Sequence, residues 1–166
     1  QKFIYKYMNW QIPKYAHIPL IHGEDGTKLS KRHGAVNLID LKNQGYLPES
    51  IINNLILLGW SPKNKDDEII NIQNIISNFN INSLSKSASI FSYKKLDYFN
   101  NYFLRLEHNI KFFEEYCESN SLLKEYLSSD KEKLFRVFNV YKKDISKYIE
   151  IVNFSEIYFS NHFSKN

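Results

Sequence analysis

The sequence predicts a mostly α-helical protein with a short α/β part near its N-terminus. Apolar residues recur at helical spacing through most of the chain after residue 36. Most of the five glycines and four prolines fall in the first third of the 166 residues, so the rest favours long helices over frequent turns. A β-prone run at 15–21 leads directly into a glycine-bounded cationic loop. With 43% hydrophobic and 16% aromatic residues, the chain can bury one good core or two small ones.

The first third predicts helices on either side of a strand and a loop. Residues 1–9 carry apolar side chains at helical spacing and predict the end of a helix that Pro13 closes. The run at 15–21 predicts a buried parallel strand, and open α/β sheets bind ligands at the carboxyl ends of such strands. A short helix at 38–44 is expected to end at Gly45, because glycine readily adopts the left-handed conformation of a helix C-cap.

Pro48 predicts the first turn of the next helix, over 49–58, which Gly59 ends. A broad buried face is expected from its apolar residues Ile51, Ile52, Leu55, Ile56 and Leu58. Residues 63–67 read as a polar loop, and Ile72, Ile75, Ile76 and Phe79 mark a further amphipathic helix.

The second half predicts a succession of helices. A strong helix is expected over 92–105, with an apolar side made of Leu96, Phe99, Tyr102 and Phe103. Shorter helices are expected at 107–118, 121–128, 131–142 and 144–152, followed by an aromatic tail of Phe154, Tyr158, Phe159 and Phe163.

The loop at 23–34 concentrates groups that bind phosphate. Positive φ and close approach of the backbone to a ligand are open to Gly23, Gly26 and Gly34. The donors suited to an anion are Thr27, Lys28, Ser30, Lys31 and Arg32. A solvated connection remains the alternative interpretation. His33 either donates to a phosphate or shapes the turn, and Glu24 and Asp25 are more typical of turn chemistry than of an acid and base pair.

Lys28-Leu29-Ser30-Lys31-Arg32 resembles the Lys-Met-Ser-Lys-Ser motif of class I aminoacyl-tRNA synthetases, in the Lys-Leu-Ser-Lys-Arg variant of glutamyl-tRNA synthetases. The departures from the parent motif are Leu29 and Arg32, and both lysines are kept. The resemblance extends through residues 1–104 in further stretches: Ala16-His17-Ile18-Pro19-Leu20-Ile21, His33-Gly34-Ala35-Val36, Gly45-Tyr46-Leu47-Pro48-Glu49, Leu58-Gly59-Trp60-Ser61 and Lys95-Leu96-Asp97-Tyr98-Phe99-Asn100.

The resemblance implies three regions. Residues 1–37 are expected to be the end of a Rossmann-like α/β catalytic domain with the phosphate loop. Residues 38–105 are expected to contact the tRNA stem. Residues 106–166 are expected to begin an α-helical anticodon-binding domain. Because the chain starts at Gln1 on an amphipathic pattern, we expect it to be a C-terminal part of a longer enzyme.

The implied reaction is the activation of glutamate by ATP and its transfer to the 3′ end of tRNA-Glu. Lys28 and Lys31 are the expected catalytic residues, and the expected ATP-binding residues are Lys28, Leu29, Ser30, Lys31 and Arg32. Mg²⁺ is expected to accompany ATP, with no metal held by protein side chains. The expected partners are therefore tRNA-Glu, ATP and L-glutamate, bound by a monomer in the bacterial cytoplasm, or in an organelle if the source is eukaryotic.

The helix at 92–105 also carries the residues expected to contact tRNA, namely Lys94, Lys95 and Arg105. Its aromatic residues serve either the core or the nucleic acid, and helical spacing favours the core. The glutamate-binding residues and the His-Ile-Gly-His motif of the family belong upstream, so the chain alone is expected to be inactive.

Other classes of function fit the sequence less well. The single cysteine, Cys117, excludes an internal disulfide and a thiolate zinc cluster, and it is expected to be buried. The histidines lack metal-ligand spacing, and no apolar run is long enough to span a bilayer. The net charge of +4 is compatible with a nucleic-acid partner without requiring one. Residues 83–87 imitate the phosphate motif, but Ser83 stands where its first lysine belongs.

Three alternatives to a glutamyl-tRNA synthetase remain open. A glutaminyl-tRNA synthetase is related, but its carboxy-terminal half is a pair of β-barrels. A tRNA-modifying paralogue that transfers glutamate lacks the helices expected after residue 106. A non-catalytic helical RNA-binding module would use the basic loop to grip the phosphate backbone.

Overall fold

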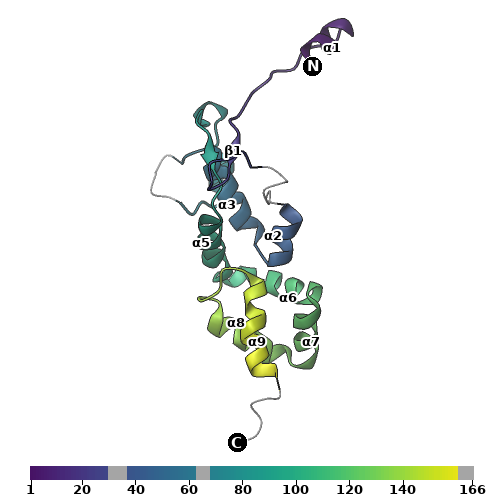
Figure 1. The fold of residues 1–166 in the computed structure, drawn as a ribbon, viewed down its shortest axis with the longest axis vertical. Coiled ribbons are helices and arrows are strands. Elements are labelled where there is room, and N and C mark those ends of the chain that lie inside the picture. The colour runs from purple at the N-terminus through teal and green to yellow at the C-terminus, as the bar shows by residue number, and fades with distance from the viewer. Residues whose placement is uncertain (30–36, 63–67, 161–166) are drawn as a thin grey trace, which may run out of the picture.

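The computed structural model describes residues 1–29, 37–62 and 68–160, which form an elongated and mainly helical molecule (Figure 1). The N-terminal part comprises α1 (Lys2–Tyr7), β1 (Ile21–His22), α2 (Leu38–Gln44), α3 (Pro48–Gly59), α4 (Ile72–Asn78), the 3-10 helix η2 (Ile81–Ser83), β2 (Ser89–Ile90) and α5 (Tyr93–Leu104). The C-terminal part comprises η3 (Glu107–Asn109), α6 (Ile110–Ser119), α7 (Ser121–Ser129), α8 (Lys131–Tyr141), η4 (Tyr148–Glu150) and α9 (Ile151–Phe159). The predicted combination of a short strand, a loop and many helices is confirmed.

The strand expected at 15–21 is wrong for all but its last residue. Only Ile21 and His22 form a strand, and they pair in parallel with Ser89 and Ile90 of β2. Ile18 is 70% exposed, and no other strand lies beside 15–20 within the described residues. A β-prone run forms a regular strand only where a neighbour completes its hydrogen bonds.

Helices α1, α2 and α3 begin and end close to where the sequence predicts. Asn9 adopts φ 54 beyond the end of α1, so the chain leaves the helix ahead of Pro13. The Asn37 side chain accepts a 3.0 Å hydrogen bond from the Ile39 amide and caps α2. Gly45 ends α2 at φ 88, and Pro48 lies in the first turn of α3.

The buried face predicted for α3 is partly wrong. Ile51 is buried, but Ile52 and Leu55 are 42% and 48% exposed. Polar side chains take the buried positions instead, namely Ser50, Asn53 and Asn54. Asn53 donates to the Glu68 carbonyl at 2.8 Å and accepts from the Ile70 amide at 2.7 Å. The inner side of α3 therefore bonds the backbone of a neighbouring segment, which apolar side chains cannot do.

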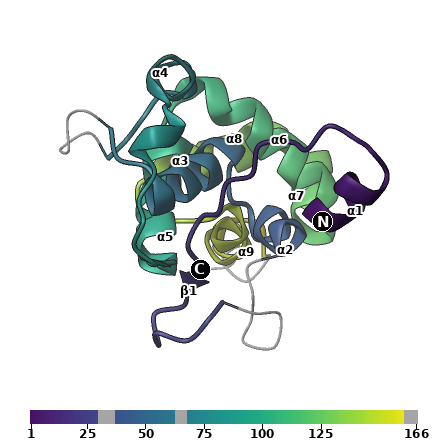
Figure 2. The same cartoon turned by 90° about the horizontal axis from the view of Figure 1, so that it is seen from above.

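Helix α5 packs against α3, and the two lie side by side in both views (Figure 1, Figure 2). Leu96, Phe99 and Phe103 are buried, which confirms that the apolar side of this helix serves the core. Tyr102, which was expected on the same side, is 43% exposed. In the predicted helix at 72–79 only Ile75 is buried, so the rest of that apolar set faces solvent.

The Asn100 side chain of α5 joins three parts of the chain. It accepts hydrogen bonds from the Leu47 amide at 2.8 Å and the Ser50 hydroxyl at 2.6 Å. It donates to the Gly45 carbonyl at 3.3 Å and to the Ser146 carbonyl at 2.6 Å. Because Asn100 is fully buried, the Leu47 amide and the Ser146 carbonyl would lose their hydrogen bonds without it, whereas Ser50 and Gly45 each keep a second bond.

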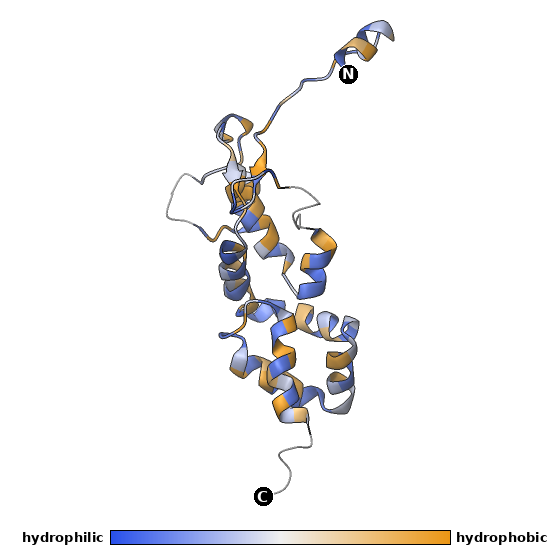
Figure 3. Cartoon of the chain, viewed as in Figure 1, coloured by the Kyte–Doolittle hydropathy of each residue, from blue (hydrophilic) through white to orange (hydrophobic). Residues whose placement is uncertain are grey.

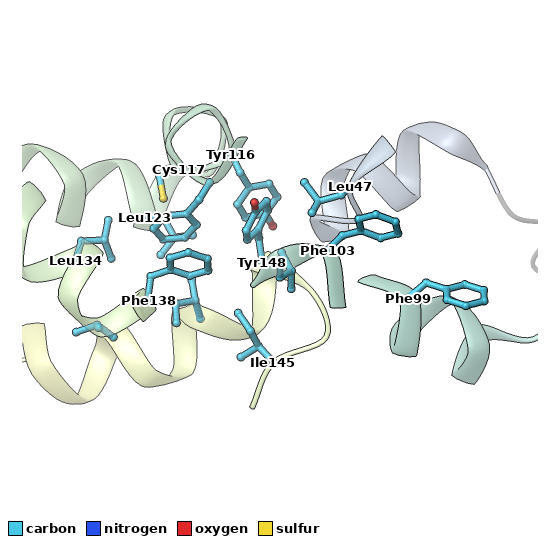
Figure 4. Close-up of a cluster of buried hydrophobic side chains, with 14 residues drawn as sticks. Leu47, Phe99, Phe103, Tyr116, Cys117, Leu123, Leu134, Phe138, Ile145 and Tyr148 are labelled. Carbon is cyan, nitrogen blue, oxygen red and sulfur yellow. The ribbon is translucent and has the colours of Figure 1, made fainter. Parts of the chain in front are cut away.

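The C-terminal helices enclose the largest core cluster, and hydrophobic and hydrophilic residues alternate along them (Figure 3). Phe113 stacks on Phe138 with 4.0 Å between ring centroids, and its ring also contacts Tyr148. Phe138 and Tyr148 lie among the side chains of this cluster in Figure 4. The cluster includes Leu47 and Phe103, so the core continues into the N-terminal part. Cys117 is buried as predicted, and burial raises the pKa of its thiol to about 12.

Of the four helices predicted after 106, the first three are confirmed with small shifts, and the fourth, predicted at 144–152, is wrong for 144–147, since helix begins only at η4. Residues 142–147 are not helical, because the Asn101 amide of α5 bonds the carbonyls of Lys143 at 3.1 Å and Ile145 at 2.6 Å. The predicted aromatic tail belongs instead to α9, where Phe154 stacks on Tyr141 at 4.1 Å. Phe163 and the predicted loop at 63–67 lie outside the described residues.

The junction at Gly45 gives a stability test. A Cβ there would lie 2.5 Å from the Tyr148 Cβ and 2.7 Å from the Tyr148 backbone nitrogen, in addition to the strain of φ +88. We expect Gly45→Ala to lower the free energy of unfolding in urea by about 2–4 kcal/mol. Gly59→Ala is the matched control, because a Cβ there meets nothing within 4 Å, and it should leave stability unchanged or slightly higher. Equal effects of the two substitutions would contradict this account of the junction.

Candidate functional site

The candidate site is the loop that follows β1. The structure describes its residues 23–29, so the placement of Lys28 and Leu29 is known. The predicted ATP-binding residues Ser30, Lys31 and Arg32, together with His33, lie outside the described residues.

The backbone of residues 23–29 forms a tight reversal. The Gly23 amide donates to the Thr27 carbonyl at 2.9 Å, and the Gly26 amide donates to the Gly23 carbonyl at 3.0 Å. Gly26 adopts φ 75, a conformation open to glycine at little cost. Lys28 forms an antiparallel bridge with His22, which fixes the backbone at Lys28 beside the strand.

Asp25 has the role in the turn that the sequence predicts. One of its carboxylate oxygens accepts the Thr27 amide at 3.0 Å, and the Thr27 hydroxyl lies 2.9 Å from both oxygens. A hydrogen bond from an aspartate to the amide two residues on is an Asx-turn, which stabilises a reversal locally. Asp25 therefore shapes the loop.

The start of α5 holds the other side of the loop. The Phe91 amide donates to the His22 carbonyl at 2.8 Å, and the Ser92 hydroxyl donates to Glu24 Oε1 at 2.5 Å. The sequence indicated Ser92 only as the start of a helix. Its contact with a residue 68 positions away carries no local sequence signal.

Leu29 anchors the loop to the protein interior. Its side chain is half-buried and packs against an apolar cluster made of Leu41, Tyr46, Ile51, Phe91 and Leu96. Its amide donates to the Ile21 carbonyl at 3.0 Å. Leu29 therefore secures the loop, and it directs the neighbouring Lys28 into an exposed position.

Lys28 lies beside a small open pocket of about 170 Å³. The other residues that line it are Gly23, Glu24, Asp25, Thr27, Leu29, Phe91 and Tyr93. Among the described residues Lys28 forms no ion pair, so no carboxylate there neutralises its ammonium group. An exposed cation that has no ion pair among the described residues can bind a phosphate without first breaking a contact to any of them.

The predicted tRNA contacts lie along α5 and do not form one site. Lys94, near its start, is about 16 Å from Arg105 by the helical rise. Lys95 pairs with Glu68 at 2.9 Å, whereas Arg105 donates to Asn101 and to the Lys143 carbonyl. Eleven residues are close to three helical turns, so Lys94 and Arg105 share one side of α5.

No group of three or more His, Cys, Asp or Glu residues within the described part of the chain could hold a metal ion. His108 lies 3.7 Å from Glu49 and contacts no further carboxylate in the described set of ion pairs. No helix in the described residues is long and apolar enough to cross a membrane.

Comparison with known proteins relates most of the chain to one group of enzymes. Residues 1–98 match the sequence profile of the family described as tRNA synthetases class I (E and Q), catalytic domain. The chain is 46% identical over 114 residues to glutamate-tRNA ligase 1 of Bartonella tribocorum, covering 69% of this chain and 24% of that protein. It is 46% identical over 129 residues to glutamate-tRNA ligase 2 of Rickettsia akari, covering 78% of this chain and 27% of that protein.

Solved structures extend the likeness into the C-terminal helices. A crystal structure of a glutamate tRNA ligase from Elizabethkingia meningosepticum, in complex with its amino acid, covers 94% of this chain and 34% of its own, with a TM-score of 0.71 and 27% identity. The glutamate-tRNA synthetase of Elizabethkingia anophelis covers 91% and 34%, with a TM-score of 0.69 and 28% identity.

The chain spans about a quarter of the length of the curated relatives that it matches. The family profile covers more than half of the chain and includes β1, the candidate loop and the first half of α5. The chain therefore belongs to the class I tRNA synthetase family of the E and Q enzymes.

Proposed function

We propose that this chain is part of a glutamate-tRNA ligase and supplies the loop that binds the leaving phosphates of ATP. The observation that carries the proposal is Lys28, an exposed cation without an ion pair among the described residues, on a loop pinned from both sides. The relatives named above as glutamate-tRNA ligases support the choice of amino acid and tRNA.

The chemistry requires fixed positive charge. The glutamate carboxylate attacks the α-phosphate of ATP, the bond to the β-phosphate breaks, and pyrophosphate leaves with negative charge. Lys28 and Lys31 would stabilise that developing charge, while Ser30, Arg32 and backbone amides would hold the phosphates. Leu29 would serve ATP binding indirectly, since it fixes the loop to the interior.

Rigid attachment of the loop favours catalysis. Cations that are already in place stabilise a transition state without a further cost of reorganisation. Backbone bonds to Ile21 and the Ser92 contact to Glu24 hold residues 23–29 before any ligand binds. Mg²⁺ would arrive with ATP and be held mainly by phosphate oxygens.

The chain holds only part of the proposed active site. A His-Ile-Gly-His motif is absent from its sequence, in which His17 and Ile18 are followed by Pro19. We therefore expect the 166-residue chain alone to charge no tRNA. The enzyme that contains it would act as a monomer, in the bacterial cytoplasm or in an organelle of a eukaryotic source.

Transfer RNA would lie along the exposed side of α5. Lys94, Tyr98 and Tyr102 are exposed there and share that side with Arg105. Basic side chains interspersed with tyrosine rings suit contact with the sugar-phosphate backbone of a nucleic acid. Lys95 is the weakest of the three predicted contacts, because Glu68 already pairs with it. The regions 1–37, 38–105 and 106–166 remain our proposed division into catalytic, stem-contacting and anticodon-binding parts.

The exposed side of α5 also favours the second candidate, a non-catalytic RNA-binding module. Salt and ATP dependence distinguish the two. Binding that weakens steeply with salt, in a protein that charges no tRNA, would support the module. A glutaminyl enzyme is less suitable, because the helical C-terminal half aligns with solved glutamate-tRNA ligases.

Substitution of the loop lysines tests the proposed reaction in the complete enzyme. We expect Lys28→Ala and Lys31→Ala each to slow glutamate-dependent exchange of pyrophosphate into ATP by about a hundredfold to a thousandfold, because a fixed cation is lost at the leaving group. Lys86→Ala is the matched control, since Lys86 lies in an exposed copy of the Leu-Ser-Lys sequence, and it should change the rate less than twofold. A comparable loss in all three variants would remove the loop from the chemistry.

The tRNA surface gives a second test. Lys94→Ala should raise KM for tRNA-Glu several-fold with little change in kcat, and it should reduce the salt slope of tRNA binding by about one unit. Lys124→Ala, an exposed lysine on α7, is the control and should alter neither quantity. An unchanged salt slope in Lys94→Ala would exclude this lysine as a phosphate contact.

A further inference from the structure

Ser92 stands at the N-cap of α5 but does not cap that helix. A serine at this position ordinarily accepts a hydrogen bond from an amide in the first turn. The Ser92 hydroxyl makes no such bond and donates instead to Glu24 Oε1 at 2.5 Å. Helix α5 therefore forgoes a stabilising local contact in favour of one with the candidate loop.

The contact is one of two that clamp the loop. In the other contact the Phe91 amide donates to the His22 carbonyl at 2.8 Å. Phe91 directly precedes Ser92, and His22 lies two residues before Glu24. These bonds lie on either side of Gly23, so they fix the direction in which the loop leaves β1. The Glu24 carboxylate is thereby held at the start of α5, where the helix dipole favours negative charge.

The position of this carboxylate matters because Glu24 and Lys28 line the same pocket. A glutamate four residues from a lysine on one turn would, if released, partly neutralise it. An anionic ligand would then compete with Glu24 for the Lys28 ammonium group. While Ser92 binds Glu24, that competition is suppressed.

We propose that Ser92 is a positioning residue that holds the Glu24 carboxylate at the start of α5 and so keeps Lys28 available for phosphate. This rests on the proposed function only in that the phosphates there are those of ATP. Ser92 is not among the residues that line the pocket beside Lys28. It acts through Glu24.

The test uses the complete enzyme that contains this chain, with inorganic pyrophosphate as the probe. Binding is followed through the NMR shifts of the Gly26 and Lys28 amides. Ser92→Ala should weaken pyrophosphate binding about three- to tenfold, because the released carboxylate competes for the lysine. Ser92→Thr keeps a hydroxyl and should restore most of the affinity. Ser128→Ala, which removes an exposed hydroxyl that bonds within α7, should change the affinity less than twofold.

A charge-removing background separates this role from a purely structural one. In a Glu24→Gln chain no carboxylate is released, so adding Ser92→Ala should change pyrophosphate affinity less than twofold. An equal loss in both backgrounds would overturn the proposal, as would a Ser92→Ala chain that binds pyrophosphate like the wild type. A wild-type chain that binds no pyrophosphate would overturn it too.

The complete enzyme distinguishes this inference from the proposed function. If the enzyme charges tRNA-Glu but Ser92→Ala leaves its pyrophosphate affinity unchanged, only the role of Ser92 is refuted. If the pyrophosphate affinity depends on Ser92 and Glu24 but the protein charges no tRNA, the proposed synthetase function is refuted and the role of Ser92 stands.

Discussion

The arrangement depends on the buried hydrogen bonds of Asn100. This one side chain bonds the turn between α2 and α3, the first turn of α3 and the segment that precedes η4. A buried polar group without a partner costs about 1–3 kcal/mol, so removal of Asn100 would add this cost at both the Leu47 amide and the Ser146 carbonyl. An apolar residue of the same size could fill the space but could not replace these bonds. The junction is therefore specified by hydrogen-bond geometry as well as by packing.

A second polar contact, between Tyr46, Asp97 and Lys147, lies next to the hydrogen bonds of Asn100. Tyr46 donates its hydroxyl proton to Asp97, and the Lys147 amine lies 3.9 Å from the same carboxylate oxygen. Burial, with the Asp97 hydrogen bond as a further cause, raises the pKa of Tyr46, so the phenol stays protonated as the donor. Tyr46 also packs in the cluster that holds Leu29. The junction and the candidate loop thus share a side chain.

The sequence predicted features whose causes are local. Gly45 and Pro48 mark helix ends through their own backbone preferences, so both ends were found. The buried asparagines of α3 were not, because Asn53 is explained only by the Glu68 and Ile70 backbone that it bonds. The lack of helix just before 148 also has a distant cause, because the Asn101 side-chain amide of α5 bonds the carbonyls of Lys143 and Ile145.

The candidate site shows the same division. Its lysine motif could be read from five residues, whereas the clamp by Ser92 joins residues far apart in sequence. Two of the stretches that carry the family resemblance, 45–49 and 95–100, are bonded to each other through Leu47 and Asn100. Residues that helped to identify the family therefore stabilise its fold.

The attachments of the loop have a mechanical consequence. β1 pairs with β2, and Leu29 packs against the apolar cluster that includes Phe91 and Leu96, so residues 23–29 are fixed to the strand and helix that follow them in sequence by some 60 residues. Residues 11–20, on its other side, have no regular structure and are mostly exposed. Residues 23–29 and α5 would consequently move as one rigid body. A ligand that shifts α5 from its exposed side would carry the backbone of Lys28 with it, although the two binding surfaces share no residue.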